Sequence, residues 1–326
     1  MNETREIDRL KEQIRECRKL PTLPGVAAQL VQYCFEPDAE LGEIARILGH
    51  DPALSAKVLK VVNSPFYGLR KQVTTLSHAV ALLGFNSIRT LALSFSLVRG
   101  LRRNGRGGFD YAHYWRRSVL SGAAARALGL ANDLENPEEL LLAGLLQDIG
   151  LLALQEVLSE EYGCLVKQSA GDHILLQRLE MEHLGVDHAQ VGGWLAEMWQ
   201  LPEVFQISLC CSHDPDRMEV PEELLSMVQC VSLSGWIADI WMDDQPLRAY
   251  RQALQQTHSI LGMEQEAFES VLASIDEFLP NLSVLFDIRL GGFSSVKQVV
   301  RFVKEQSESP SPIDSASLSK NSSLTA

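Results

Sequence analysis

Basic residues are scarce in this sequence. Its 326 residues include 29 Lys and Arg against 42 Asp and Glu, which gives a formal net charge of -13 at pH 7. Because nucleic-acid phosphates are bound by clustered Lys and Arg, this balance argues against a general nucleic-acid-binding protein and leaves room only for a local basic patch.

Long apolar runs and paired cysteines are also missing. No apolar run approaches the roughly 18 residues that cross a bilayer, and the opening MNETREIDRLKEQIRE is too charged for a secretory signal. We therefore expect a cytoplasmic protein without a membrane association. The six cysteines show no CxxC spacing, and the adjacent Cys210 and Cys211 are poorly placed to share a structural zinc ion, so we expect reduced thiols, most of them buried.

Apolar residues at helical spacing dominate what is present. Hydrophobic residues make up 46% of the chain and charged residues 22%, as in a folded globular protein. In DPALSAKVLKVVN, an apolar stripe follows Asp51, a candidate N-cap, and Pro52, which suits the first helical position. Few segments alternate with period two, so we predict an all-α fold. Helices are expected at about residues 111–130, 137–156, 172–184, 187–200 and 203–213.

Composition also suggests how the chain is divided. The segment RGLRRNGRGGFD, residues 99–110, has the Gly and Arg content of a loop, and we interpret it as a solvated connector, with binding of an anion as the alternative. We expect an N-terminal helical lobe over residues 1–105 and a second helical lobe with a helical extension over 106–305. The Ser-rich residues 306–326 are predicted to be disordered, because they can bury too little apolar surface. How residues 245–305 pack is left open.

Seven segments follow one another in a fixed order along roughly residues 15–240. They are LPTLPGVAAQL, DPALSAKVLKVVNSPFYG, LSHAVALLGFNSIRTLAL, YWRRSVLSGAAARAL, LLAGLLQDIGLLAL, HLGVDHAQVGGWLAEMWQLP and CSHDP. Together they resemble the HDOD domain of bacterial signalling proteins, and DPALSAKVLKVVNSPFYG carries the strongest part of the resemblance. It implies two helical lobes, the second related to the HD superfamily of metal-dependent phosphohydrolases, which includes cyclic-dinucleotide phosphodiesterases of the HD-GYP type. Members of the HDOD family generally lack the complete metal site.

The resemblance places a degenerate phosphohydrolase site in the second lobe. Working HD enzymes hold one or two divalent ions with His and Asp side chains, which polarise a phosphoryl oxygen and generate hydroxide. Here the His-Asp pair reads Gln147-Asp148, and an amide is a weak ligand beside an imidazole. The vestigial pocket would consist of Arg117, Gln147, Asp148, His188, Ser212 and His213. Asp239 and His183 are less favoured additions to the surviving donors Asp148, His188 and His213. The last metal-binding Asp of HD enzymes aligns with Ser234-Gly235 in this chain.

Arg117 stands about where the first metal-binding His of the family pattern would lie. A guanidinium there would repel a metal ion, and its simplest role is to pair with Asp148, which would satisfy that carboxylate without a cofactor. Binding of an anionic ligand through Arg117 is the alternative. We expect no catalytic residue, no cofactor and no bound metal, with Asp148, His188 and His213 as a loose, weak set of donors.

In the first lobe, Asn63, Ser64 and Pro65 are expected to end a buried helix. A second interpretation is a partner-binding surface, because exposed aromatics are favoured at interfaces. That surface would comprise Asn63, Ser64, Pro65, Phe66, Tyr67 and Arg89.

The resemblance, together with the incomplete set of metal donors, therefore implies a non-catalytic regulatory protein that acts through protein contacts. The resemblance implies partners such as diguanylate cyclases, phosphodiesterases of cyclic-di-GMP signalling or two-component regulators, and self-association is left open. Two alternatives remain: a sensor that binds a nucleotide or another anion in the former active-site pocket, and a residual metal-dependent phosphohydrolase.

Overall fold

The structure, a computed structural model, describes residues 2–17, 20, 25–34, 46–64, 67–69, 71–101, 109–290, 296, 298–301 and 303. These residues form helices and connecting turns with no strand among them, which confirms the predicted all-α class. The labelled helices are α1 (Asn2–Glu16), α2 (Gly25–Cys34), α4 (Pro52–Val62), α5 (Leu76–Leu83), α6 (Phe85–Leu101), α7 (Tyr111–Ala131), α8 (Pro137–Leu146), α9 (Gly150–Ser169), α10 (His173–Leu184), α11 (His188–Met198), α12 (Glu203–Cys210), α13 (Glu222–Met242), α14 (Pro246–Leu261) and α15 (Gln265–Phe286). The predicted lobe boundary, most of the linker and the Ser-rich tail lie outside the described residues.

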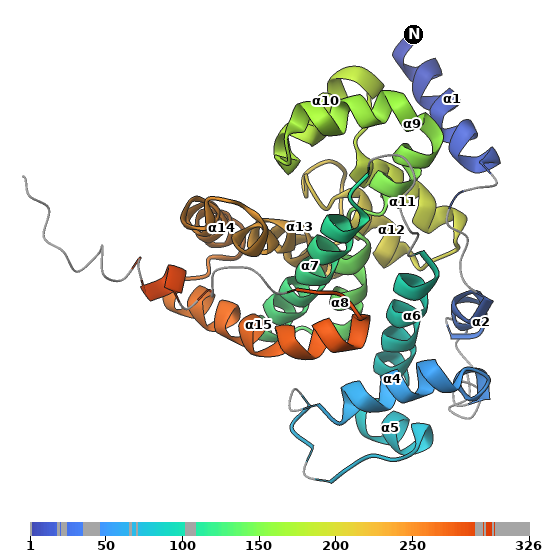
Figure 1. Cartoon of the computed structure of the whole chain (residues 1–326), viewed down its shortest axis with the longest axis vertical. Coiled ribbons are helices and arrows are strands. Elements are labelled where there is room, and N and C mark those ends of the chain that lie inside the picture. The colour runs from blue at the N-terminus through green and yellow to red at the C-terminus, as the bar shows by residue number, and fades with distance from the viewer. Residues whose placement is uncertain are drawn as a thin grey trace, which may run out of the picture.

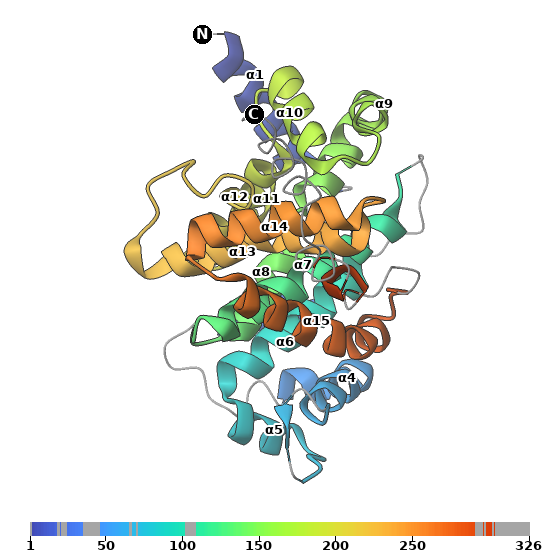
Figure 2. The ribbon, with the colours of Figure 1, turned by 90° about the vertical axis from the view of Figure 1, so that its left-hand side faces the viewer.

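The helices lie in an elongated stack (Figure 1). Helices α4, α5 and α6 lie at one end, α9 and α10 lie at the other, and α7, α8 and α13 fill the middle. Figure 2 shows α14 and α15 on the outside of this central layer. Helix α14 packs on α13, while α15 packs mainly on α7 and also touches α4 and α6. Residues beyond 245 therefore bind both lobes together, which the sequence pattern left open.

Two helical stretches are long and apolar enough to span a membrane, by length and composition alone: Pro137–Ser169 and Glu222–Met242. The bent pair α5 and α6 would make a third if it were one span. The expectation that no apolar run approaches this length was therefore wrong. In the fold, 83% and 67% of the two stretches' most apolar windows are buried against other helices, so their apolar side chains form the core of the stack.

Small residues let α7 and α8 cross at close range. A Cβ added to Gly144 of α8 would lie 2.7 Å from the Ser121 carbonyl oxygen and 2.9 Å from the Gly122 Cα, both on α7. These are backbone atoms, which cannot rotate away as a side-chain tip would. The close crossing brings Arg117 of α7 to the end of α8, where Asp148 follows.

The helix predicted over 137–156 is broken. Helix α8 ends at Leu146, residues 147–149 form a turn, and α9 begins at Gly150. The break coincides with a second close crossing, because a Cβ on Gly150 would lie 2.0 Å from the His188 carbonyl oxygen of α11. Periodicity alone could not reveal the break, since apolar residues continue through it. The turn presents Asp148 to the helices around it.

The first lobe confirms the predicted helix ends. Asp51 caps α4 by accepting a hydrogen bond from the Leu54 backbone N–H at 3.0 Å. At the other end, the Asn63 amide donates to the Leu59 and Val73 carbonyls and accepts from the Val73 N–H, at 2.7–2.8 Å. Asn63 thus ends the helix and fixes the loop that leads to α5. Pro65 and Phe66 lie outside the described residues.

We predict that Gly144→Ala destabilises the fold by about 1–3 kcal/mol, because its new methyl group meets α7 backbone and forces the two helices apart. The matched control is Gly163→Ala in α9, where an added Cβ meets nothing within 4 Å. That change should stabilise the protein by about 0.5–1 kcal/mol through helix propensity. Urea unfolding followed by circular dichroism measures both. Equal stability of the two variants would contradict the close crossing of α7 and α8.

Candidate functional site

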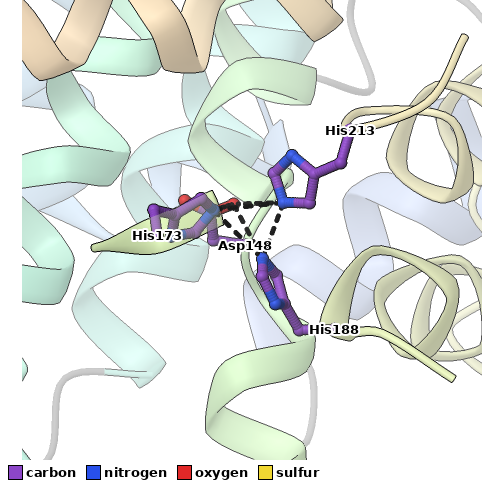
Figure 3. Close-up of side chains that lie close together, drawn as sticks. All are labelled: Asp148, His173, His188 and His213. Carbon is purple, nitrogen blue, oxygen red and sulfur yellow. Dashed lines mark hydrogen bonds and ion pairs between the residues drawn. The ribbon is translucent and has the colours of Figure 1, made fainter. Parts of the chain in front are cut away.

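Four side chains from four separate segments converge inside the second lobe (Figure 3). Asp148 lies in the turn between α8 and α9, His173 and His188 are the first residues of α10 and α11, and His213 follows α12. One carboxylate oxygen and three imidazole nitrogens lie within 4.8 Å of one another, an arrangement that could hold a metal ion. We call these four residues the His–Asp cluster.

The two oxygens of Asp148 have different partners. Its Oδ2 accepts from the Arg117 guanidinium at 2.5 Å, so the predicted ion pair between the two residues is present. Arg117 also contacts the Asp239 carboxylate at 3.2 Å. Burial opposes ionisation of Asp148, but the Arg117 guanidinium and the neighbouring His173 hold the pKa of its carboxyl well below the usual range. Asp148 is therefore a buried anion.

The other oxygen, Oδ1, faces the histidines. It lies 3.4 Å from His173 Nε2, 3.4 Å from His213 Nε2 and 3.6 Å from His188 Nε2. Within the described residues, none of these contacts has the geometry of a hydrogen bond, so Oδ1 is a buried acceptor without a hydrogen-bond donor.

Helix caps place two of the imidazoles. Asp172 caps α10 by accepting from the Leu175 N–H, and Asp187 caps α11 in a reciprocal capping box with Gln190. Each cap fixes the first helical residue, which is a histidine in both cases. The sequence shows this as two Asp-His pairs, at 172–173 and 187–188.

Glu180 orients His188 from behind. The Glu180 Oε2 accepts from His188 Nδ1 at 2.6 Å and from its backbone N–H at 2.9 Å, while Oε1 accepts from the Tyr162 hydroxyl. Burial by itself lowers the pKa of the His188 imidazole, but the Glu180 and Asp148 carboxylates outweigh it and raise that pKa to about 10. With Nδ1 held by Glu180, the His188 Nε2 points at the cluster.

A second ion pair fixes the segment that carries His213. The Arg217 guanidinium donates to both carboxylate oxygens of Asp187 and, at 2.7 Å, to the Cys210 carbonyl. Because Asp187 precedes His188 and Cys210 ends α12, this pair joins the start of α11 to the turn after α12. His188 and His213 are brought together by it.

The other residues predicted for the pocket are not among the four members of the His–Asp cluster. The Gln147 Oε1 accepts from Ser234 Oγ at 3.1 Å, so this amide points toward α13. Ser212 is buried, and Asp239 binds Arg117. His183 is exposed at the far end of α10, where it contacts the Leu179 carbonyl.

Tyr67 and Arg89 of the predicted interaction surface make contacts within the chain. The Tyr67 hydroxyl donates to Glu138 at 2.7 Å, Arg126 pairs with the same carboxylate at 2.9 Å, and Arg89 pairs with Glu139 at 3.3 Å. Both glutamates lie in the first turn of α8. The structure thus uses these side chains to hold the first lobe against α8, and a partner surface in this segment stays a prediction.

Sequence reasoning missed His173, Glu180 and Tyr162. His173 supplies the fourth donor, where only a loose set of three was expected. A signal existed in the repeated Asp-His pair, because a capping Asp defines the direction of the next side chain. Glu180 and Tyr162 gave no such signal, since a Glu and a Tyr inside amphipathic helices are ordinary.

We predict that Arg117→Met destabilises the chelator-treated protein by about 3–5 kcal/mol at pH 7, because it leaves the buried Asp148 anion uncompensated. The pKa of Asp148 in the folded protein lies below its value in the unfolded chain, which is about 3.9. The stability that Arg117 supplies is therefore complete above that value and is lost as the pH falls through the lower folded pKa. Urea unfolding at pH 7 and in acid should show the difference between wild type and variant shrinking in acid.

Arg178→Met, at an exposed position on α10, is the control and should change stability by less than about 0.5 kcal/mol. A pH-independent effect of Arg117→Met would contradict the assignment.

Comparison with known proteins agrees with this architecture. The HDOD domain model matches residues 20–215. An uncharacterised protein of Treponema pallidum (strain Nichols) is 26% identical over 217 residues, which is 66% of this chain but only 41% of that relative. The chain thus spans less than half the length of this relative.

Solved structures share the fold. An HDOD domain protein of unknown function from Geobacter sulfurreducens superposes with a TM-score of 0.66 at 21% identity, over 88% of this chain and 99% of that one. A protein of Shewanella amazonensis SB2B, provisionally named a phosphohydrolase, gives 0.65 at 24% identity over 86% and 98%. A provisionally named signal transduction protein of Marinobacter aquaeolei VT8 gives 0.61 at 21% identity over 87% and 66%. Because the family model covers more than half of it, the chain belongs to the HDOD domain family.

Proposed function

We propose that this chain is a non-catalytic regulatory protein of bacterial signalling that acts through protein contacts. The observation that carries this proposal is the Arg117 guanidinium, held at 2.5 Å on Asp148 and at 3.2 Å on Asp239. Two-metal phosphohydrolases use two ions about 3.5–4 Å apart to stabilise the attacking and leaving oxygens. Here a fixed cation takes one oxygen of the Asp148 carboxylate and repels a second ion beside it.

Burial of the cluster supports the same proposal. The side chains of Asp148 and His188 are 1% and 0% exposed, and those of His173 and His213 are 15% and 10% exposed. A phosphodiester substrate needs direct access to the reacting ion, and such side chains offer access only to something as small as an ion. The same burial, and the commitment of Arg117 to two carboxylates, count against a pocket for a nucleotide or another large anion.

Helix α8 offers a route from the cluster to the first lobe. Its first turn holds Tyr67 and Arg89 through Glu138 and Glu139, and its last residue leads into Asp148 within two positions. Ten residues of helix span about 15 Å. A structural change at the His–Asp cluster would therefore be transmitted along α8 to its contacts with Tyr67 and Arg89. A signalling protein bound to either lobe would then meet an altered surface. The partner classes expected are diguanylate cyclases, phosphodiesterases and two-component regulators.

We predict no phosphodiesterase activity above that of Asp148→Ala when the full chain is assayed with bis(p-nitrophenyl) phosphate and cyclic-di-GMP in the presence of Mn²⁺. The physical reason is that Arg117 excludes the second ion. Release of p-nitrophenol and chromatography of the dinucleotide provide the two readouts. Chelator-sensitive turnover that Asp148→Ala abolishes would establish the residual phosphohydrolase instead.

A partner that co-purifies from the source bacterium tests the regulatory half of the proposal. Once reconstituted from purified components, its activity should change on addition of the chain. An unchanged activity for every such partner would contradict regulation by contact.

A further inference from the structure

The four donor atoms of the His–Asp cluster are spaced as the ligands of one metal ion would be. The Nε2 atoms lie 3.2 Å apart for His173 and His213, 3.2 Å for His173 and His188, and 2.6 Å for His188 and His213. Their distances to Asp148 Oδ1 are 3.4–3.6 Å. A tetrahedron around an ion with bonds of about 2.0–2.1 Å has edges of about 3.3 Å. Only the His188–His213 edge departs from that value by more than a few tenths of an ångström.

Hydrogen bonds alone cannot satisfy the three imidazoles. Each Nε2 of a neutral ring either carries a proton or offers a lone pair. Among three mutually contacting nitrogens, at least two must be in the same state, so at least one contact sets proton against proton or lone pair against lone pair. A single cation in the middle satisfies all three at once, because each ring then directs a lone pair inward.

Asp148 and the surrounding charges indicate a cation as well. Within the described residues, the Asp148 Oδ1 has no hydrogen-bond donor although it is buried and aimed at the three rings. The nearby carboxylates of Asp148, Glu180 and Asp239 are opposed by the Arg117 guanidinium. Imidazoles that ligate a metal are neutral, and in that state these charged side chains sum to two negative charges, which one divalent ion neutralises. Without the ion, a proton on His188, between Glu180 and Asp148, supplies part of this compensation. Burial makes that compensation worth more than it would be in water.

We propose that this chain binds one divalent transition-metal ion of the zinc type through Asp148, His173, His188 and His213. Three imidazoles and one carboxylate favour Zn²⁺, Ni²⁺ or Co²⁺ over Mg²⁺ and Ca²⁺, which prefer all-oxygen sites. Glu180 on His188 Nδ1 supplies the carboxylate–histidine support typical of such centres. His173 lies outside the positions to which the family resemblance assigns metal ligands.

The metal has a structural role in this proposal. Four protein ligands close the coordination sphere of a tetrahedral ion and leave no position for a reacting water. The binding site thus goes beyond the proposed function and does not depend on it. Helix α10 packs mainly on α9 and is joined to α11 by the Glu180–His188 hydrogen bonds. The ion adds a second link to α11 and ties α10 to the turn after α12. Metal loading therefore sets how firmly α10 is held.

The test uses the full chain, stripped with a chelator and dialysed. Isothermal titration with Zn²⁺ alone should give one site per chain, and Zn²⁺ should raise the melting temperature by mass action. Co²⁺ should give the intense visible absorption of a four-coordinate ion without a thiolate charge-transfer band. Amide hydrogen exchange in α10 should slow when Zn²⁺ is added.

Two histidines on α10 provide a matched pair of variants. His173→Ala should weaken Zn²⁺ binding at least about 100-fold and abolish the slowing of exchange, because it removes a ligand. His183→Ala, at the exposed end of the same helix, should leave both unchanged. Glu180→Gln should weaken binding by about 10–100-fold.

Three results would overturn the proposal: no stoichiometric Zn²⁺ in the wild type, unchanged affinity in a folded His173→Ala protein, or a thiolate band that assigns the metal to cysteine. These readouts do not include turnover, so a failure of metal binding leaves the proposed regulatory function standing. Phosphodiester hydrolysis, in contrast, would overturn the proposed function and leave the metal site in place.

Discussion

The buried carboxylate of Asp148 is the constraint around which the second lobe is organised. A carboxylate buried without partners is costly, so both of its oxygens must be met by positive groups. Arg117 meets one oxygen from α7, and three imidazoles from three other segments face the second. The close crossings at Gly144 and Gly150 make this possible, because they bring α7 and α11 near enough for those side chains to reach.

The two Asp148 oxygens have different partners, and this difference limits the chemistry that the site can support. A guanidinium is a permanent cation in a fixed geometry that carries no activated water. On the Arg117 side, the charge that a catalytic ion would supply is thus supplied by a side chain without reactivity. On the histidine side, the donors form a closed set of four, suited to holding an ion in place. The Asp148 carboxylate is thus met by a fixed cation on one side and by a set of metal-donor atoms on the other.

The same helices join the site to the rest of the molecule. Helix α8 carries two glutamates at its N-terminal end that hold Tyr67, Arg89 and Arg126, and it runs directly into the turn of Asp148. Helix α15 adds a second connection, since it packs on α7 and reaches α4 and α6. Helices α8 and α15 and the contacts of Tyr67 and Arg89 therefore join the two lobes by a short path.

The sequence by itself determined the helical class, the Asp51 cap, the end of α4 at Asn63, and the pairing of Arg117 with Asp148. The first three depend on local spacing or on one residue's chemistry, which a linear pattern contains. The Arg117–Asp148 pair followed from the family resemblance, which places both residues at one site. Only the tertiary structure decided the break after Leu146, the packing of α14 and α15, and the inclusion of His173 in the cluster. The apolar pattern runs through the break unchanged, and His173 lies far along the chain from Asp148 with no shared motif. The proximity of His173 to Asp148 results from the packing of α10 on α9, which periodicity along one helix does not encode.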